Sequence, residues 1–162
     1  VSTFQPLVFR LAFRLLCDED EAKDMVQETF VKVWLALGKY NGECRFSTWI
    51  YKITCNTCYD RLRSLYHSPL DNEADYSVSV NISSDDNVEL AVVNKQLREL
   101  ILRYTDELSP RQRLIFTLRD IEELDVPEVQ TITGLSAGII KTTLYLARKN
   151  IRNKMNQIDA GL

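Results

Sequence analysis

Apolar residues recur every three or four positions along most of this 162-residue chain, and this spacing restricts the fold more than any other feature. A period of 3.6 residues places apolar side chains on one face of an α-helix. No stretch alternates apolar and polar residues for long, and the chain holds only 5 Gly and 4 Pro. The sequence therefore predicts an all-α fold.

Helix starts can be located from capping residues. Asp18, Ser47, Ser109 and Ser136 are N-cap candidates, and Ser109 precedes a proline, which suits the first helical position. With these signals and the apolar periodicity, we expect helices over about 4–16, 19–38, 47–65, 86–105 and 110–122, a short one from 126, and a last one over about 137–155.

Residues 67–88 interrupt the helical pattern. They are rich in Ser, Asn and Asp, and no apolar stripe runs through them. They carry a net charge of −5, whereas residues 1–66 and 89–162 each carry +1. We therefore expect two small helical domains, 1–66 and 89–162, joined by an acidic flexible linker over 67–88. Domains of this size have thin cores and lean on partners for rigidity.

Composition excludes several classes of protein. No apolar run is long enough to cross a bilayer and no signal peptide opens the chain, so a cytoplasmic location is expected without membrane insertion. The four cysteines are too few for a disulfide scaffold. No catalytic set of side chains and no phosphate loop is recognisable, so neither an enzyme nor a cofactor is expected.

The last predicted helix has one apolar and one basic face. Apolar residues recur every three or four positions along it and form one face, which consists of Ala137, Ile140, Leu144, Ala147, Ile151 and Met155. With the short helix and the turn at Gly134 before it, it forms the pattern of a DNA-binding helix-turn-helix, whose second helix enters the major groove. The expected DNA contacts are Ser136, Gly138, Lys141, Thr142, Tyr145, Arg148, Lys149 and Arg152, with Arg119 on the preceding helix. The alternative is a solvated basic face of an ordinary bundle helix.

A second polar stripe lies on the helix predicted over 47–65. Lys52, Asn56, Tyr59 and Arg63 share one side and Trp49 flanks it, whereas Ile50, Ile53, Cys58, Leu62 and Leu65 cover the inner side. Cations with aromatic rings suit single-stranded or distorted DNA, because rings stack on exposed bases. The alternative is again a solvated face.

The helix predicted over 19–38 has an outer face that begins acidic and ends apolar, formed by Asp24, Gln27, Glu28, Val31 and Leu35. Its inner face consists of Ala22, Met25, Val26, Phe30, Val33 and Leu37. The outer face suggests a docking surface for another protein. Alternatively, Val31 and Leu35 pack on the first helix.

These residues resemble a known family. The runs Asp24–Phe30, Asn41–Glu43 and Phe46–Ile53 look like the second region of bacterial sigma factors. The runs Leu108–Arg113 through Arg119, Gly134–Gly138 and Ala147–Arg148 look like their fourth region. The order and the absence of a middle domain resemble the compact extracytoplasmic-function class.

The resemblance implies a role for each surface. The outer face of the second helix would bind the clamp helices of the β′ subunit of core RNA polymerase, and the protein would also meet the β flap. The stripe with Trp49, and the loop from Asn41 to Phe46, would capture bases of the melted minus-ten element. The last helix would read the minus-thirty-five element as duplex. The linker would thread toward the RNA exit path, and an anti-sigma factor is a possible further partner.

The chain departs from the family pattern at three positions. Gln130 stands where a small residue is usual, Ile139 where a polar one is, and Thr143 where a basic one is. The last change predicts the loss of one phosphate contact.

Two other classes of function stay open at this stage. One is a helix-turn-helix regulator that acts without being a polymerase subunit. The other is a redox or metal sensor built on Cys55 and Cys58, although a structural zinc site needs four ligands and Cys17, Cys44 and His67 are the remaining candidates. Two cysteines one helical turn apart more often pack in a core.

Overall fold

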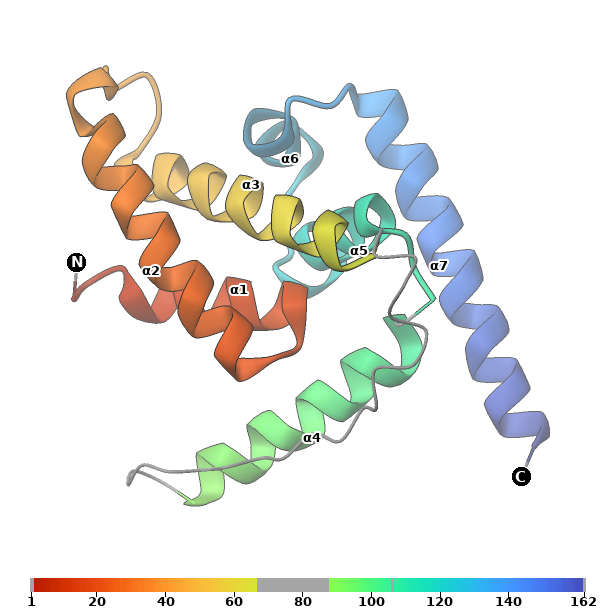
Figure 1. The fold of residues 1–162 in the computed structure, drawn as a ribbon. Helices are drawn as coiled ribbons and strands as arrows, with labels where there is room; N and C mark the ends of the chain where they lie inside the picture. Colours follow the sequence, from red (N-terminus) through yellow and green to blue (C-terminus); the bar gives the residue numbers. More distant parts are fainter. Residues whose placement is uncertain (1, 67–87, 106, 162) are drawn as a thin grey trace.

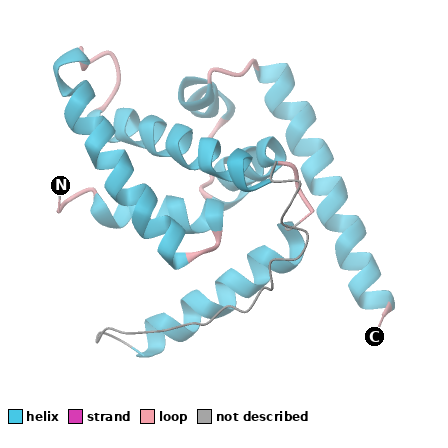
Figure 2. Ribbon diagram, viewed as in Figure 1, coloured by secondary structure: helices cyan, strands magenta, loops and turns pink. Residues whose placement is uncertain are grey.

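The computed structural model describes residues 2–66, 88–105 and 107–161, and the regular elements among them are all helical (Figure 1; Figure 2). The N-terminal half contains α1 (Gln5–Leu16), α2 (Glu19–Ala36), the 3₁₀ turn η1 (Leu37–Lys39) and α3 (Phe46–Tyr66). The C-terminal half contains α4 (Val88–Thr105), α5 (Pro110–Phe116), the π-helical stretch η2 (Thr117–Ile121), α6 (Val126–Thr133) and α7 (Ala137–Ala160). The all-α prediction is confirmed, and the predicted linker lies almost wholly outside the described residues.

Three of the four N-cap predictions are confirmed. The side chains of Asp18, Ser109 and Ser136 accept hydrogen bonds from the backbone N–H three residues later and begin α2, α5 and α7. The prediction for Ser47 is wrong, because α3 already begins at Phe46.

The N-terminal half is a three-helix unit in which α1, α2 and α3 all contact one another. Two apolar clusters hold it together. One contains Val8, Val26, Val33 and Ile50, and the other contains Leu11, Leu15, Met25 and Leu62 among its members. Leu37 and Leu65 were predicted on inner faces, and this is wrong: their side chains are exposed, because η1 and the end of α3 project beyond the unit.

The C-terminal half contains the predicted helix-turn-helix. A capping box at Asp125 begins α6, Gly134 ends it in the left-handed conformation with φ of 74°, and Ser136 then caps α7. Ile140, Leu144 and Ala147 of α7 are buried, as predicted. Met155 is exposed, so its assignment to the buried face is wrong; α7 extends past the other helices at this end (Figure 1).

The two halves share a core. α3 contacts both α5 and α6, and in Figure 1 its C-terminal end overlaps α5 while α6 lies to one side of it. One apolar cluster contains Leu15, Tyr51 and Cys55 from the N-terminal half together with Ile115 and Leu118 from the C-terminal half. Each half thus supplies apolar surface that the other covers, which is consistent with the thin core expected of so small a domain.

Among residues 2–66, 88–105 and 107–161, none of the helices combines the length and the hydropathy that a bilayer crossing requires.

Candidate functional site

The outer face of α2 is exposed along its whole length. Its members are Asp24, Gln27, Glu28, Val31 and Leu35, which we call the α2 docking surface. Val31 is 57% exposed and Leu35 is 75% exposed, so the alternative in which they pack on α1 is wrong. Glu28 pairs with Lys32 one turn later at 2.8 Å, whereas Asp24 makes no ion pair with any other described residue.

Trp34 belongs to the same surface and was missed by the sequence analysis. Its side chain is 77% exposed, beside Val31 and Leu35. The spacing of the residues could have predicted this position. Trp34 follows Gln27 by seven residues and Val31 by three, and both intervals place side chains on the same side of a helix. An exposed tryptophan side chain at the apolar end of such a surface is typical of a residue that anchors the binding of another protein.

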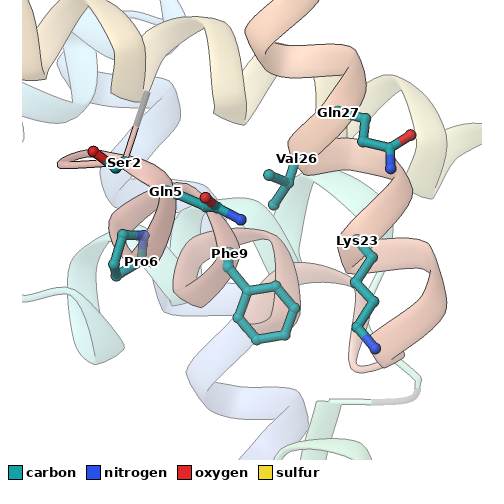
Figure 3. A pocket seen from close by; sticks show the side chains of 7 residues that line it. All are labelled: Ser2, Gln5, Pro6, Phe9, Lys23, Val26 and Gln27. Atoms are coloured by element: carbon teal, nitrogen blue, oxygen red, sulfur yellow. The ribbon is translucent and has the colours of Figure 1, made fainter. Parts of the chain in front are cut away.

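An open groove of about 480 Å³ runs beside the α2 docking surface (Figure 3). Its lining comes from Pro6 and Phe9 of α1 and from Lys23, Val26 and Gln27 of α2, with Ser2 and Gln5 at its end. Gln27 thus lies both on the docking surface and at the edge of the groove (Figure 3).

The polar stripe of α3 is present. Lys52, Asn56 and Arg63 are exposed, and Tyr59 is half-buried. The guanidinium of Arg63 lies over the Tyr59 ring, 5.6 Å from its centroid, so the cation and the ring face the same side.

Trp49 is placed next to this stripe by other aromatic rings. It is half-buried, with its ring centroid 5.1 Å from that of Tyr40 and 5.5 Å from that of Phe46. In the adjoining loop, exposed Asn41 accepts a hydrogen bond from the backbone N–H of Glu43 at 3.2 Å, and Gly42 has φ of 76°. The loop and the stripe therefore lie together at the start of α3.

The basic face of α7 points away from the core. Gly138, Lys141, Thr142, Tyr145, Lys149 and Arg152 are exposed, Tyr145 at 65%. A hollow of about 620 Å³ opens along this face, and Lys141, Tyr145, Arg148, Lys149 and Arg152 line it with Arg119. Five cations around a concave surface form a site of positive potential suited to a phosphate backbone.

Three of the predicted DNA contacts also have partners within the protein. Arg148 donates two hydrogen bonds to the carboxylate of Asp120, at 2.6 and 2.8 Å, and that pairing raises the pKa of the guanidinium. Arg119 donates to the backbone carbonyl of Leu124. The hydroxyl of Ser136 accepts from the N–H of Ile139 as the cap of α7. Arg148 and Ser136 thereby help to hold α7 in its position, whereas the bond of Arg119 joins η2 to the segment before α6.

The three departures from the family pattern differ in how far their side chains are buried. Thr143 is 8% exposed and packs toward the core, and the prediction that it costs a phosphate contact stays a prediction. Gln130 is half-buried on α6 and Ile139 is 43% exposed near the start of α7, on the reading side.

Cys55 and Cys58 are core residues. Both are buried, and burial raises the pKa of each thiol, to about 12 for Cys58. Across the described ranges, no group of three or more His, Cys, Asp or Glu side chains is arranged to hold a metal ion. This geometry favours packing over a sensor.

Comparison with protein families matches both halves. Residues 1–67 match the family described as Sigma-70 region 2, and residues 98–151 match Sigma-70, region 4. The chain belongs to the sigma-70 family. A sigma factor directs RNA polymerase to promoters and performs no catalysis itself.

Relatives of this sigma factor belong to one class. The ECF RNA polymerase sigma-E factors of Salmonella typhimurium strain LT2 and Escherichia coli strain K12 are each 28% identical to it over 164 residues, covering 98% of this chain and 85% of theirs. The ECF RNA polymerase sigma factor SigW of Bacillus subtilis is 23% identical, covering 98% and 88%. The protein is therefore a sigma factor of the extracytoplasmic-function class.

Two solved structures share the fold. RpoE of Bartonella quintana, solved in complex with the anti-sigma factor NepR, aligns with a TM-score of 0.64 at 21% identity, covering 95% of this chain and 92% of that one. CnrH, solved with the cytosolic domain of CnrY, aligns with a TM-score of 0.65 at 19% identity, covering 97% and 85%.

Proposed function

We propose that this sigma factor initiates transcription in the cytoplasm through three surfaces that work together. The α2 docking surface with Trp34 binds the β′ clamp helices of core RNA polymerase. The α3 stripe with Trp49 and Asn41 captures unpaired bases of the minus-ten element. The basic face of α7 reads the minus-thirty-five element as duplex DNA.

The observation that carries the proposal is the exposure of the α2 docking surface. A chain that only bound DNA would gain nothing from leaving Val31, Trp34 and Leu35 in water on a helix remote from the basic face of α7. The competing function, a helix-turn-helix regulator independent of polymerase, uses α7 alone and leaves this surface without a role.

The proposal extends to the division of labour along the chain. Residues 1–66 act as the domain for polymerase and the minus-ten element, 89–162 as the domain for the minus-thirty-five element and the β flap, and 67–88 as an acidic tether. The support is composition, since the acids of 67–88 stand between two balanced halves. We also propose an anti-sigma factor as a partner, because RpoE and CnrH were each solved with a second protein.

Reversing the charge of the α2 docking surface tests the proposal directly. The double variant Asp24→Lys, Glu28→Lys replaces two exposed acids and is expected to abolish capture of core RNA polymerase in a pull-down. Asp159→Lys is the matched control, because it makes the same change at an exposed position near the end of α7. Normal capture by the double variant, with helix content unchanged by circular dichroism, would show that polymerase binds elsewhere.

A further inference from the structure

Three exposed side chains lie along one side of α7, next to its basic face. Ile139, Thr142 and Leu146 follow one another at intervals of three and four residues, and such intervals return to the same side of a helix. Ile139 is 43% exposed, Leu146 is 42% exposed, and Thr142 is exposed as well. We call these three residues the α7 apolar flank. The surfaces described so far give no role to Ile139 or Leu146.

The apolar flank lies outside the core. Ile139 and Leu146 belong to neither of the two apolar clusters of the described residues. The inner side of the same stretch of α7 is formed by Ile140, Leu144 and Ala147, which are buried. The side chains of the flank therefore keep apolar surface in contact with water, where a binding partner can cover it.

The surface beside the flank indicates that this partner is duplex DNA. Thr142 directly follows Lys141, so the flank adjoins the hollow that five cations line. An apolar protein surface would bury these cations without neutralising them, whereas a phosphate backbone neutralises them. This step rests on the proposed function, in which α7 reads duplex DNA.

The place of the flank along α7 favours contact with bases. Ser136 caps α7 and accepts a hydrogen bond from the N–H of Ile139 at 3.3 Å, so Ile139 lies in the first turn. The first residues of a recognition helix meet base edges in the major groove. The apolar group that a base edge displays there is the C5-methyl group of thymine. From Ile139 to Leu146 the helix rises about 10 Å, the length of about three base-pair steps.

We propose that the α7 apolar flank reads thymine methyl groups in the minus-thirty-five element. Ile139, Leu146 and the methyl group of Thr142 contact thymines within about three consecutive base pairs, while the cations of the basic face bind phosphates. Ile139 is β-branched and has few rotamers, so ordering its side chain on DNA costs little entropy. This sigma factor then selects duplexes through apolar contacts in addition to polar ones.

Replacement of thymine by deoxyuridine tests the proposal, because it removes the C5-methyl group and keeps the Watson–Crick pair. Full-length protein first recovers its preferred duplexes from a randomised library at low salt. The library is fully paired, so the α3 stripe, which is proposed to bind unpaired bases, does not contribute. Each thymine of the recovered motif is then replaced in turn, and Kd is measured by fluorescence anisotropy. At one or more thymines we expect the wild type to bind about fourfold more weakly, as the loss of one buried methyl group predicts.

Alanine variants assign the effect to the flank. Ile139→Ala and Leu146→Ala are each expected to bind the thymine and deoxyuridine duplexes equally at one of these positions. Met155→Ala is the matched control, because Met155 is 44% exposed on the same helix beyond the flank. It is expected to discriminate between the two duplexes as the wild type does.

Equal binding of the two duplexes by the wild type would overturn this role of the flank and leave duplex reading by α7 intact. Discrimination that persists unchanged in both Ile139→Ala and Leu146→Ala would overturn it as well. Loss of core RNA polymerase capture in either variant, with discrimination unchanged, would show that the flank binds protein and not DNA. Recovery of no motif by the wild type would contradict the proposed function of α7 itself, and this inference with it.

Discussion

Trp34 is the most exposed large apolar side chain in the described part of the chain. An aromatic ring in water contributes little to folding, yet on docking it buries a large apolar area at low entropic cost. Its position at the apolar end of the α2 docking surface makes it the best candidate for the anchor of polymerase binding. In the proposed function, the acids of the same surface orient the protein toward core RNA polymerase and raise the rate at which the two associate.

The variant Trp34→Ala tests the anchor. We expect a loss of about 2 kcal/mol in binding to core RNA polymerase, roughly thirtyfold in Kd. The melting temperature should stay within about 2 °C, because the ring makes few contacts to lose. Kd is measured by biolayer interferometry and stability by thermal unfolding, with Trp49→Phe as the aromatic control. Full affinity in Trp34→Ala, or a large fall in stability, would contradict this role.

At the scale of the residue, the sequence predicted the exposure of side chains well. It did not predict which charged side chains form ion pairs with other residues of the protein. Lys52, Lys141 and Arg152 are solvated as their helical positions require. The partners of Arg148 and Glu122 lie 28 and 108 residues away along the chain. No periodic pattern contains such pairs, because they depend on how helices pack.

At the scale of the element, the proposed function assigns two kinds of DNA contact to different positions along α7. Lys141 lies near its N-terminal end, where a recognition helix meets base edges, whereas Arg152 lies almost three turns further on. Base contacts specify sequence and phosphate contacts supply affinity. Removal of a basic side chain should therefore have different effects on DNA binding at the two ends of the helix.

Alanine variants distinguish the two ends. Lys141→Ala is expected to cost about 1–3 kcal/mol for the preferred duplex and little for others, so discrimination falls. Arg152→Ala is expected to weaken all duplexes evenly and to reduce the salt dependence of binding by about one phosphate contact. Fluorescence anisotropy on matched and scrambled duplexes, at several salt concentrations, measures both. Identical profiles from the two variants would show that the assignment is wrong.

Capping chemistry explains why most helices were predictable and where the prediction stopped. Asp18, Ser109 and Ser136 cap as expected because a side-chain oxygen there satisfies a free backbone N–H. The π-helical turn of η2 and the length of α7 beyond Met155 have no such local signal. In η2 the side chain of Leu118 is fully buried by other helices, and α7 continues through a polar sequence that ends at Gly161.

At the scale of the whole molecule, the contact between the halves is the feature that the sequence could not predict. Apolar residues such as Leu62 and Ile140 were recognisable as inward-facing, but their pattern does not say which half covers them. The shared apolar cluster stabilises each half through the other, and this contribution to folding is visible only in the three-dimensional structure.

The most direct measurement of the central claim is run-off transcription from genomic DNA fragments by core RNA polymerase with and without this protein. We predict discrete, promoter-specific transcripts that require the protein and that disappear with the Asp24→Lys, Glu28→Lys variant. Transcription unchanged by the protein, together with tight promoter-duplex binding by the free chain, would contradict the account.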